Sequence, residues 1–238
     1  MYQFAYLFGI GIALIFWLTF FLARRGLRKE QIFISLLSTP LGPISQIFWF
    51  SESYWRPEYL FSIKILGVGV GVEEALFGFA AGGISSVIYE IIFRKEVSYG
   101  KRRTALAIVI FGGGALFFVL LAVGGLNPIW ASNVALFTAA VTMVFLDRTL
   151  KFDFLFSGIL MLFVAIVIYL FSLSLYPNLV EQFFIPHGIS GITMLGIPLE
   201  ELVWFTTWGA FAGIFYEFWR NAEGYSTHVL KVKQTFDI

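Results

Sequence analysis

Two pairs of adjacent glutamates stand inside long apolar stretches of the sequence, Glu73-Glu74 and Glu200-Glu201. Acidic residues are costly in such surroundings and are functional candidates by default. No Lys, Arg or His lies deep in the same stretches, and burial without a counter-charge favours the protonated acid. A neutral carboxylic acid in an apolar site can donate a proton. The four glutamates therefore predict general acid chemistry away from water.

Aromatic residues follow both pairs within one or two helical turns. They are Phe77 after the first pair, and Trp204, Phe205 and Trp208 after the second. Their closeness to the acids makes these four residues candidates for binding a substrate. The structural alternative is that the glutamates only hold helices together through hydrogen bonds to Ser, Thr and Tyr.

A second acidic motif occurs near the end of each of the same two stretches, as Tyr89-Glu90 and Tyr216-Glu217. Here the structural interpretation is favoured. We expect these residues to anchor the helices at the membrane interface and to form ion pairs with Arg94 and Arg220.

The composition shows what surrounds these residues. The 238 residues are 59% hydrophobic and 13% charged, with a mean hydropathy of +0.85, whereas a soluble domain carries about a quarter charged residues. The solvent must therefore be lipid. A net charge of +1 excludes a nucleic-acid partner. With no Cys and only two separated His, no metal site is predicted, and no cofactor is expected.

Apolar stretches long enough to cross a ~30 Å hydrocarbon core occupy residues 4–23, 31–50, 65–93, 104–123, 129–147, 153–175 and 191–219. Fourteen of the sixteen Lys and Arg lie on one side of a seven-span arrangement, the exceptions being Arg56 and Lys64. Basic residues mark the cytoplasmic side. We predict an all-α membrane protein of seven transmembrane helices in the cell membrane, with its N-terminus outside and its C-terminus in the cytoplasm.

An internal repeat relates the two halves, because both glutamate pairs and both Tyr-Glu motifs recur at an offset of 127 residues. The offset places span one on span five, two on six and three on seven, which predicts a parallel 3+1+3 repeat. The predicted units are a first three-helix repeat (1–103), a linking helix (104–123), a second three-helix repeat (124–220) and a cytoplasmic tail (221–238).

Helix-weakening residues precede both glutamate pairs. Spans three and seven should bend or start anew near Gly69–Gly71 and Gly196–Pro198, with both pairs at similar depth in the outer half of the membrane. Thr39–Pro43 should kink span two. The Gly78-x-x-x-Gly82 spacing favours close helix packing.

These motifs resemble the membrane-integral lycopene cyclases, in which a Pro-x-Glu-Glu-x-x-x-Phe-like pattern occurs once per half. In the first half, Tyr54–Tyr59 leads to Gly71–Phe77 and then to Tyr89-Glu90. In the second half, Gly196–Phe205 leads to Tyr216-Glu217. The resemblance covers essentially the whole chain as two fused halves. The first motif departs from the pattern, with Gly71 where the proline is expected.

The resemblance implies acid-catalysed, non-redox ring closure at the end groups of a linear carotenoid within the membrane. It implies that Glu200 and Glu201 carry proton transfer, with Glu73 and Glu74 as partners or base. The expected partners are the carotenoid and membrane lipid, and a homo-oligomer is left open.

Other functions compete with this interpretation. A non-catalytic carotenoid or prenyl-lipid binding protein of the same scaffold is the main alternative. A retinal protein is rejected because no Lys lies between Lys151 and Lys231 to form a Schiff base. A transporter fits the intramembrane acids, but two parallel halves of three helices plus a linker are an uncommon plan for one.

Overall fold

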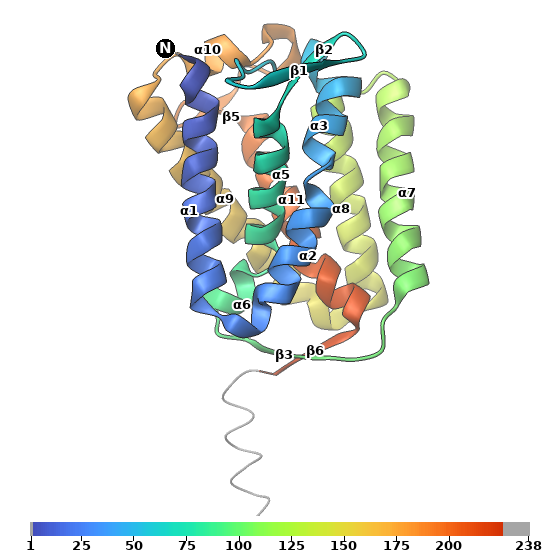
Figure 1. Cartoon of the computed structure of the whole chain (residues 1–238). Coiled ribbons are helices and arrows are strands. Elements are labelled where there is room, and N and C mark those ends of the chain that lie inside the picture. The colour runs from blue at the N-terminus through green and yellow to red at the C-terminus, as the bar shows by residue number, and fades with distance from the viewer. Residues whose placement is uncertain (1, 226–238) are drawn as a thin grey trace, which may run out of the picture.

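Long helices run side by side along one axis in the computed structural model, which describes residues 2–225 (Figure 1). Residues 226–238 of the predicted tail lie outside this range. The helices are α1 (Ala5–Ala23), α2 (Arg28–Ser38), α3 (Leu41–Ser45), α4 (Ser51–Ser53), α5 (Val72–Ser85), α6 (Ile88–Ile92), α7 (Thr104–Val123), α8 (Pro128–Leu146), α9 (Lys151–Leu175), α10 (Leu179–Phe183) and α11 (Leu199–Arg220). Short 3-10 turns at Tyr2–Phe4, Arg25–Leu27, Arg148–Leu150 and Pro186–Gly188, and a π-helical segment η3 at Gln46–Phe50, complete the helical elements.

Five helical segments in the described part of the chain are long and apolar enough to cross a membrane. They are Tyr2–Ala23, Arg25–Ser53, Thr104–Val123, Pro128–Leu146 and Arg148–Leu175. Large apolar side chains such as Ile108, Val109 and Phe145 are exposed on these helices, as the lipid environment requires. These helices are typical of a membrane protein.

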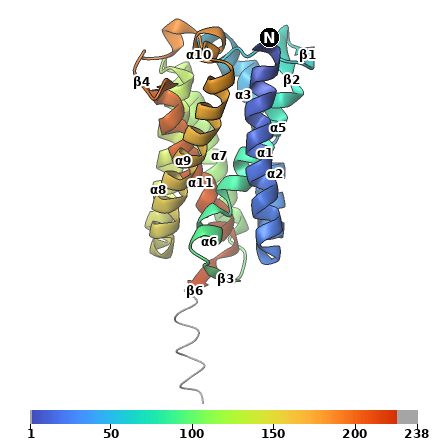
Figure 2. The same cartoon turned by 90° about the vertical axis from the view of Figure 1, so that its left-hand side faces the viewer.

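The two remaining stretches that the sequence predicted as spans form α5 with α6, and α11. Figures 1 and 2 show α11 in the middle of the bundle. Helix α5 has 14 residues and is separated from the short α6 by a turn, so neither is long enough alone to cross a bilayer. Helix α11 has 22 residues but carries several carboxylates. Its inward position protects those carboxylates from lipid.

Within residues 2–225, three two-stranded antiparallel sheets cap the bundle, which the all-α prediction did not include. At the end that holds the N-terminus, β1 (Ser62–Ile65) pairs with β2 (Val68–Gly71), and β4 (Thr193–Met194) pairs with β5 (Ile197–Pro198). At the opposite end, β3 (Glu96–Tyr99) pairs with β6 (Ala222–Tyr225) (Figure 1).

The expected kink in the second span is confirmed. Helix α2 ends at Ser38 and α3 begins at Leu41, because Pro40 supplies no N–H to continue the helix. The expected close packing is also confirmed. A Cβ added at Gly78 would lie 2.6 Å from the Ser38 carbonyl oxygen, and one at Gly82 would lie 2.3 Å from Ser38 Oγ. The α2–α3 segment therefore packs directly on the backbone of α5.

Candidate active site

The two β-hairpins position the glutamate pairs, because each hairpin leads directly into a helix. The chain leaves β2 for α5 and β5 for α11, so both helices start anew where the sequence predicted a break. Leu66 and Gly67 turn the first hairpin, and Leu195 and Gly196 turn the second. All four have positive φ values between 51° and 86°, as a two-residue turn of type I′ requires. Each glutamate pair thus lies in the first turn of its helix, at the end of the bundle that holds the N-terminus.

The first glutamate of each pair binds the backbone of a connecting loop. Glu73 Oε1 accepts hydrogen bonds from the N–H groups of Leu60 at 2.7 Å and Phe61 at 3.2 Å. Glu200 Oε1 accepts one from the Ser190 N–H at 2.6 Å. Both glutamates are buried, and neither lines the cavity that the second glutamates reach. Their position fits a role in holding the loops that cover the site.

Glu74, the second glutamate of the first pair, lines a cavity between the helices. Its Oε1 accepts hydrogen bonds from the Tyr59 hydroxyl at 2.8 Å and from the Trp55 indole N–H at 3.3 Å. Burial raises the pKa of Tyr59, which lies in the loop before β1, and the Glu74 carboxylate raises it further. The phenol therefore remains a hydrogen-bond donor.

Glu201, the second glutamate of the other pair, faces the same cavity. Its two oxygens accept from different hydroxyls, Oε1 from Tyr54 at 2.6 Å and Oε2 from Tyr169 of α9 at 2.7 Å. Adjacent residues of a helix point about 100° apart. For this reason one member of each pair reaches the cavity while the other reaches the loop.

The cavity has a volume of about 370 Å³ and is lined mainly by apolar side chains from α1, α3, α5, α7, α8, α9, α10 and α11, with Ser38 from the end of α2. The four aromatic residues predicted to bind substrate, Phe77, Trp204, Phe205 and Trp208, all line it. The Phe77 and Trp204 rings stack with centroids 5.8 Å apart, and Trp204 and Trp208 stack at 5.5 Å. They form a continuous aromatic wall beside the two carboxylates.

Gly71 stands at the position where the second motif has Pro198. The absence of a side chain there makes room for Tyr59, one of the donors to Glu74. A Cβ at this position would lie 2.2 Å from Tyr59 Cδ1 and 2.3 Å from Glu73 Oε2. The tyrosine ring therefore packs against the glycine backbone and extends its hydroxyl to Glu74. A side chain at position 71 would displace that donor.

The donors to the carboxylates were not singled out from the sequence. Three of them, Tyr54, Trp55 and Tyr59, belong to the segment that carries the family resemblance. Their position shortly before the first glutamate pair could have identified them as donors. Tyr169 lies inside an apolar helix, and no local pattern marks it.

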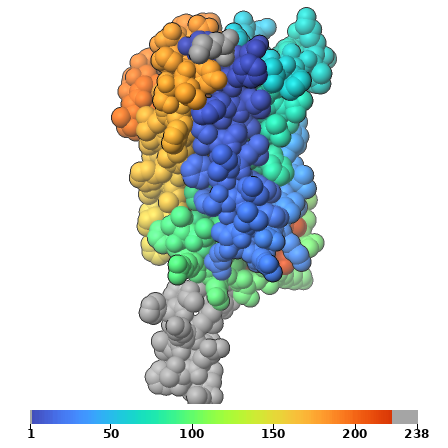
Figure 3. Space-filling view, turned by 60° about the vertical axis from the view of Figure 1, so that its left-hand side comes forward, coloured from blue at the N-terminus to red at the C-terminus, as the bar shows by residue number. Residues whose placement is uncertain are grey.

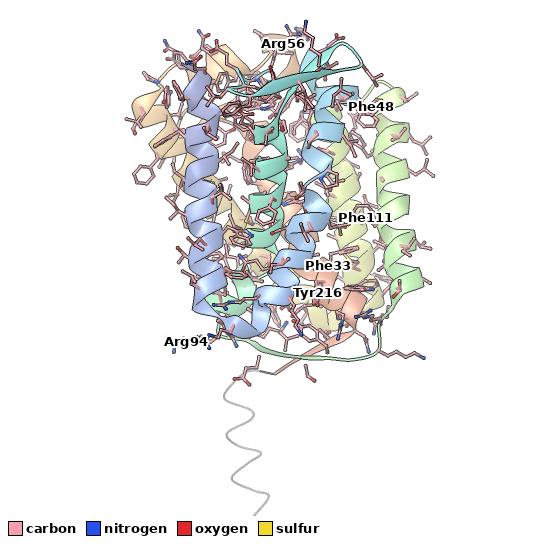
Figure 4. The ribbon with its side chains drawn as sticks, in the orientation of Figure 1. Phe33, Phe48, Arg56, Arg94, Phe111 and Tyr216 are labelled. Carbon is pink, nitrogen blue, oxygen red and sulfur yellow. The ribbon has the colours of Figure 1, made fainter. Side chains whose placement is uncertain are left out.

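The Tyr-Glu motifs lie at the opposite end of the bundle and do not reach the cavity. Figure 4 shows Tyr216 near that end, with Arg94 at its edge and Arg56 at the other extreme. Glu217 pairs with Lys95, whose Nζ is 3.0 Å from Glu217 Oε1. The expected partner Arg220 instead lies over the Tyr99 ring, 5.1 Å from its centroid.

The fold and this site define a helical membrane protein with two carboxylates at one aromatic cavity. The family model for lycopene cyclase matches residues 1–92 and 127–219. The chain belongs to the lycopene cyclase family, which supports a function in carotenoid cyclisation. No curated protein and no solved structure matches the chain.

Proposed function

We propose that the protein closes end rings on a linear carotenoid by acid catalysis, with Glu74 and Glu201 as the proton-transfer groups. The observation that carries this proposal is that these two carboxylates, from corresponding positions of two helices, face one apolar cavity. The sequence alone favoured Glu200 with Glu201. In the proposal one glutamate of each pair performs the chemistry, and Glu73 and Glu200 position the loops.

The reaction requires only that the substrate gains one proton and later loses another. One carboxylic acid protonates the terminal double bond of the substrate and leaves a tertiary carbocation. The π electrons of an internal double bond attack this cation and close a six-membered ring. Loss of a proton from a neighbouring carbon to a carboxylate restores a double bond. The product is an isomer of the substrate, so the enzyme is an intramolecular lyase or isomerase.

The aromatic wall suits the cationic intermediate. The faces of Phe77, Trp204 and Trp208 carry negative charge density and attract a cation within about 6 Å of the ring centroid. The apolar lining excludes water, which would otherwise capture the carbocation. Preorganised groups of this kind stabilise charge without reorganising during the reaction.

The size of the cavity supports binding of one end group at a time. Pockets for small molecules span roughly 300–1,000 Å³, and this cavity of about 370 Å³ lies near the lower limit. A linear carotenoid about as long as the ~30 Å bilayer core must extend beyond it. The rest of the polyene then lies along apolar helices or in lipid.

The proposed topology has seven crossings, two parallel three-helix halves and the N-terminus outside. The alternating course of the chain supports it, because α1, α5–α6, α8 and α11 run away from the N-terminal end and α2–α3, α7 and α9 return (Figures 1 and 2). The basic segments 24–29, 94–103 and 148–151 adjoin the same end of the bundle, which favours that end as cytoplasmic. The two segments matched by the family model begin 126 residues apart, close to the offset of the repeat.

Expression in a lycopene-accumulating bacterium, followed by chromatography of the pigments, tests the proposal. The parent should form ringed carotenoid, and Glu74→Gln and Glu201→Gln should abolish it at unchanged protein level in the membrane. Glu181→Gln, at an exposed position on α10, is the control. If the parent leaves lycopene unchanged but purifies with it, a carotenoid-binding protein replaces the enzyme.

A further inference from the structure

A cluster of buried carboxylates lies at the end of the bundle opposite the cavity. Glu90 of α6, Asp153 of α9 and Glu217 of α11 are 0%, 2% and 1% exposed. One oxygen from each lies within 4.8 Å of the others. Three helices from separate parts of the sequence therefore bring negative charge to a single buried point.

A fourth acid increases the charge of this cluster. Glu30 of α2 is 1% exposed and interacts electrostatically with Glu90 and Glu217. Its Oε2 accepts a 2.7 Å hydrogen bond from the Tyr99 hydroxyl. Its Oε1 is buried without a hydrogen-bond partner among the described residues.

One basic side chain bonds to the cluster within the described part of the chain. Lys95 Nζ contacts Asp153 Oδ1 and lies 3.0 Å from both oxygens of Glu217. The Arg24 guanidinium is close by, but it donates to the backbone carbonyls of Glu90 and Lys95 at 2.9 and 2.8 Å. Four carboxylates and one ammonium leave the ionised cluster with a net charge of about −3.

Glu90 is the residue of the cluster that indicates a bound ligand. Both of its carboxylate oxygens are buried and accept no hydrogen bond from any described residue. A buried charged group without a partner is strongly destabilising, and buried charges in proteins are paired or bind metal ions. Glu90 shares its cluster with two further oxygen donors, Asp153 and Glu217.

We propose that Glu90, Asp153 and Glu217 bind a hard divalent cation. Carboxylates are the ligands that Ca²⁺, Mg²⁺ and Mn²⁺ prefer, and the three groups offer no nitrogen or sulfur ligand. Glu30 adds a further negative charge beside these three groups, and Lys95 neutralises part of the excess. This site is separate from the carboxylates of the cavity.

The site would join the two halves of the protein. Glu90 comes from the first half of the chain, whereas Asp153 and Glu217 come from the second. A bound cation would fix α6 against α9 and α11 at the end opposite the glutamate pairs. Its expected effect is on stability, independently of whether the protein cyclises carotenoids.

Metal titration of the purified full chain in detergent tests the proposal. The protein is stripped with EDTA, desalted, and titrated with CaCl₂, MgCl₂ or MnCl₂ while thermal unfolding and bound metal are measured. We expect about one bound ion per chain and a rise in Tm of about 5–10 °C at a concentration 100-fold above Kd. Glu90→Gln and Asp153→Asn should lose the rise, and Glu96→Gln, an exposed acid on β3, should keep it.

The lysine provides a second test. Lys95→Gln should lower Tm in EDTA, and a divalent cation at millimolar concentration should restore Tm where NaCl at the same ionic strength does not. The proposal is overturned if the stripped parent binds none of the three ions and its Tm is unchanged by them. Protons alone would then neutralise the cluster, and Glu90→Gln should raise Tm. Should Glu90→Gln not fold, the parent titration and Lys95→Gln decide the question.

Discussion

The Tyr54 hydroxyl donates a 2.6 Å hydrogen bond to Glu201 Oε1, across 147 positions of the sequence. The next residue, Trp55, donates its indole N–H to Glu74 Oε1. One dipeptide therefore contacts both carboxylates that face the cavity and fixes them relative to each other. This relationship makes the segment between α4 and β1 part of the site, and it can be tested by substitution.

Tyr54→Phe removes one donor from Glu201 and leaves the ring in place. A hydrogen bond to a charged group contributes about 1.5–3 kcal/mol, so the rate of ring formation should fall about 10- to 100-fold. Tyr169→Phe should have a similar effect. The measurement is ringed carotenoid per unit of membrane protein, with Tyr176→Phe, outside the cavity lining, as control. Parental rates in both variants would exclude these hydroxyls from the chemistry.

Glu→Gln substitutions should distinguish the roles of the two glutamates in each pair. Glu74→Gln and Glu201→Gln remove a transferable proton from the cavity and should reduce product by at least about 10²-fold. Glu73→Gln and Glu200→Gln keep an amide oxygen that can accept the loop N–H groups, so cyclisation should continue within a few-fold of the parent.

Alanine at the loop-holding positions should affect folding instead. Glu73→Ala leaves the Leu60 and Phe61 N–H groups without their acceptor, at a cost of about 1–3 kcal/mol. A lowered Tm with normal turnover by the remaining folded protein is expected. Complete loss of product in Glu73→Gln would instead give this carboxylate a chemical role.

Gly71→Ala should disturb the site through Tyr59. The added Cβ would overlap the tyrosine ring, and overpacking of this kind costs about 1–3 kcal/mol. We expect lower Tm and slower cyclisation. Gly69→Ala, two residues earlier in the same strand with no atom within 4 Å of its added Cβ, is a matched control and should resemble the parent. Equal behaviour of the two variants would contradict the assigned role of Gly71.

A one-ringed carotenoid should accumulate before any two-ringed product. Both glutamate pairs lie in the first turns of α5 and α11, which begin at the same end of the bundle, and a linear carotenoid has its second end ~30 Å away. Two rings then require release and rebinding in the opposite orientation. Time-resolved chromatography after substrate addition measures this order. Simultaneous appearance of one- and two-ringed products at the earliest times would argue for two sites working together.

Much of the site could be predicted because acidic residues are energetically unfavourable inside apolar stretches and therefore stand out in the sequence. The four glutamates and the aromatic residues after them stood out by type and spacing, and two of these glutamates and all four of these aromatics line the cavity. The helix starts before both pairs were predictable from Gly and Pro. These are local signals that need no knowledge of packing.

The missed features depend on contacts between distant segments or on weak local signals. Residues 65–71 were predicted as the start of a span, but they belong to the β1–β2 hairpin. The break between α5 and α6 has no proline; there Ser85 and Ser86 bond to the carbonyls of Ala81 and Gly83, which competes with regular helix bonding. The acidic cluster was also missed, because its four carboxylates come from four different helices.

Each half of the chain supplies groups that the other half needs. Glu201 depends on Tyr54 from the first half, and the surface in Figure 3 shows α1 flanked by segments of both halves. Division of the chain at the exposed turn Gly124–Gly125 should therefore yield two fragments that are inactive alone. Co-expression of the fragments should restore activity, so that a single polypeptide would behave as an obligate heterodimer.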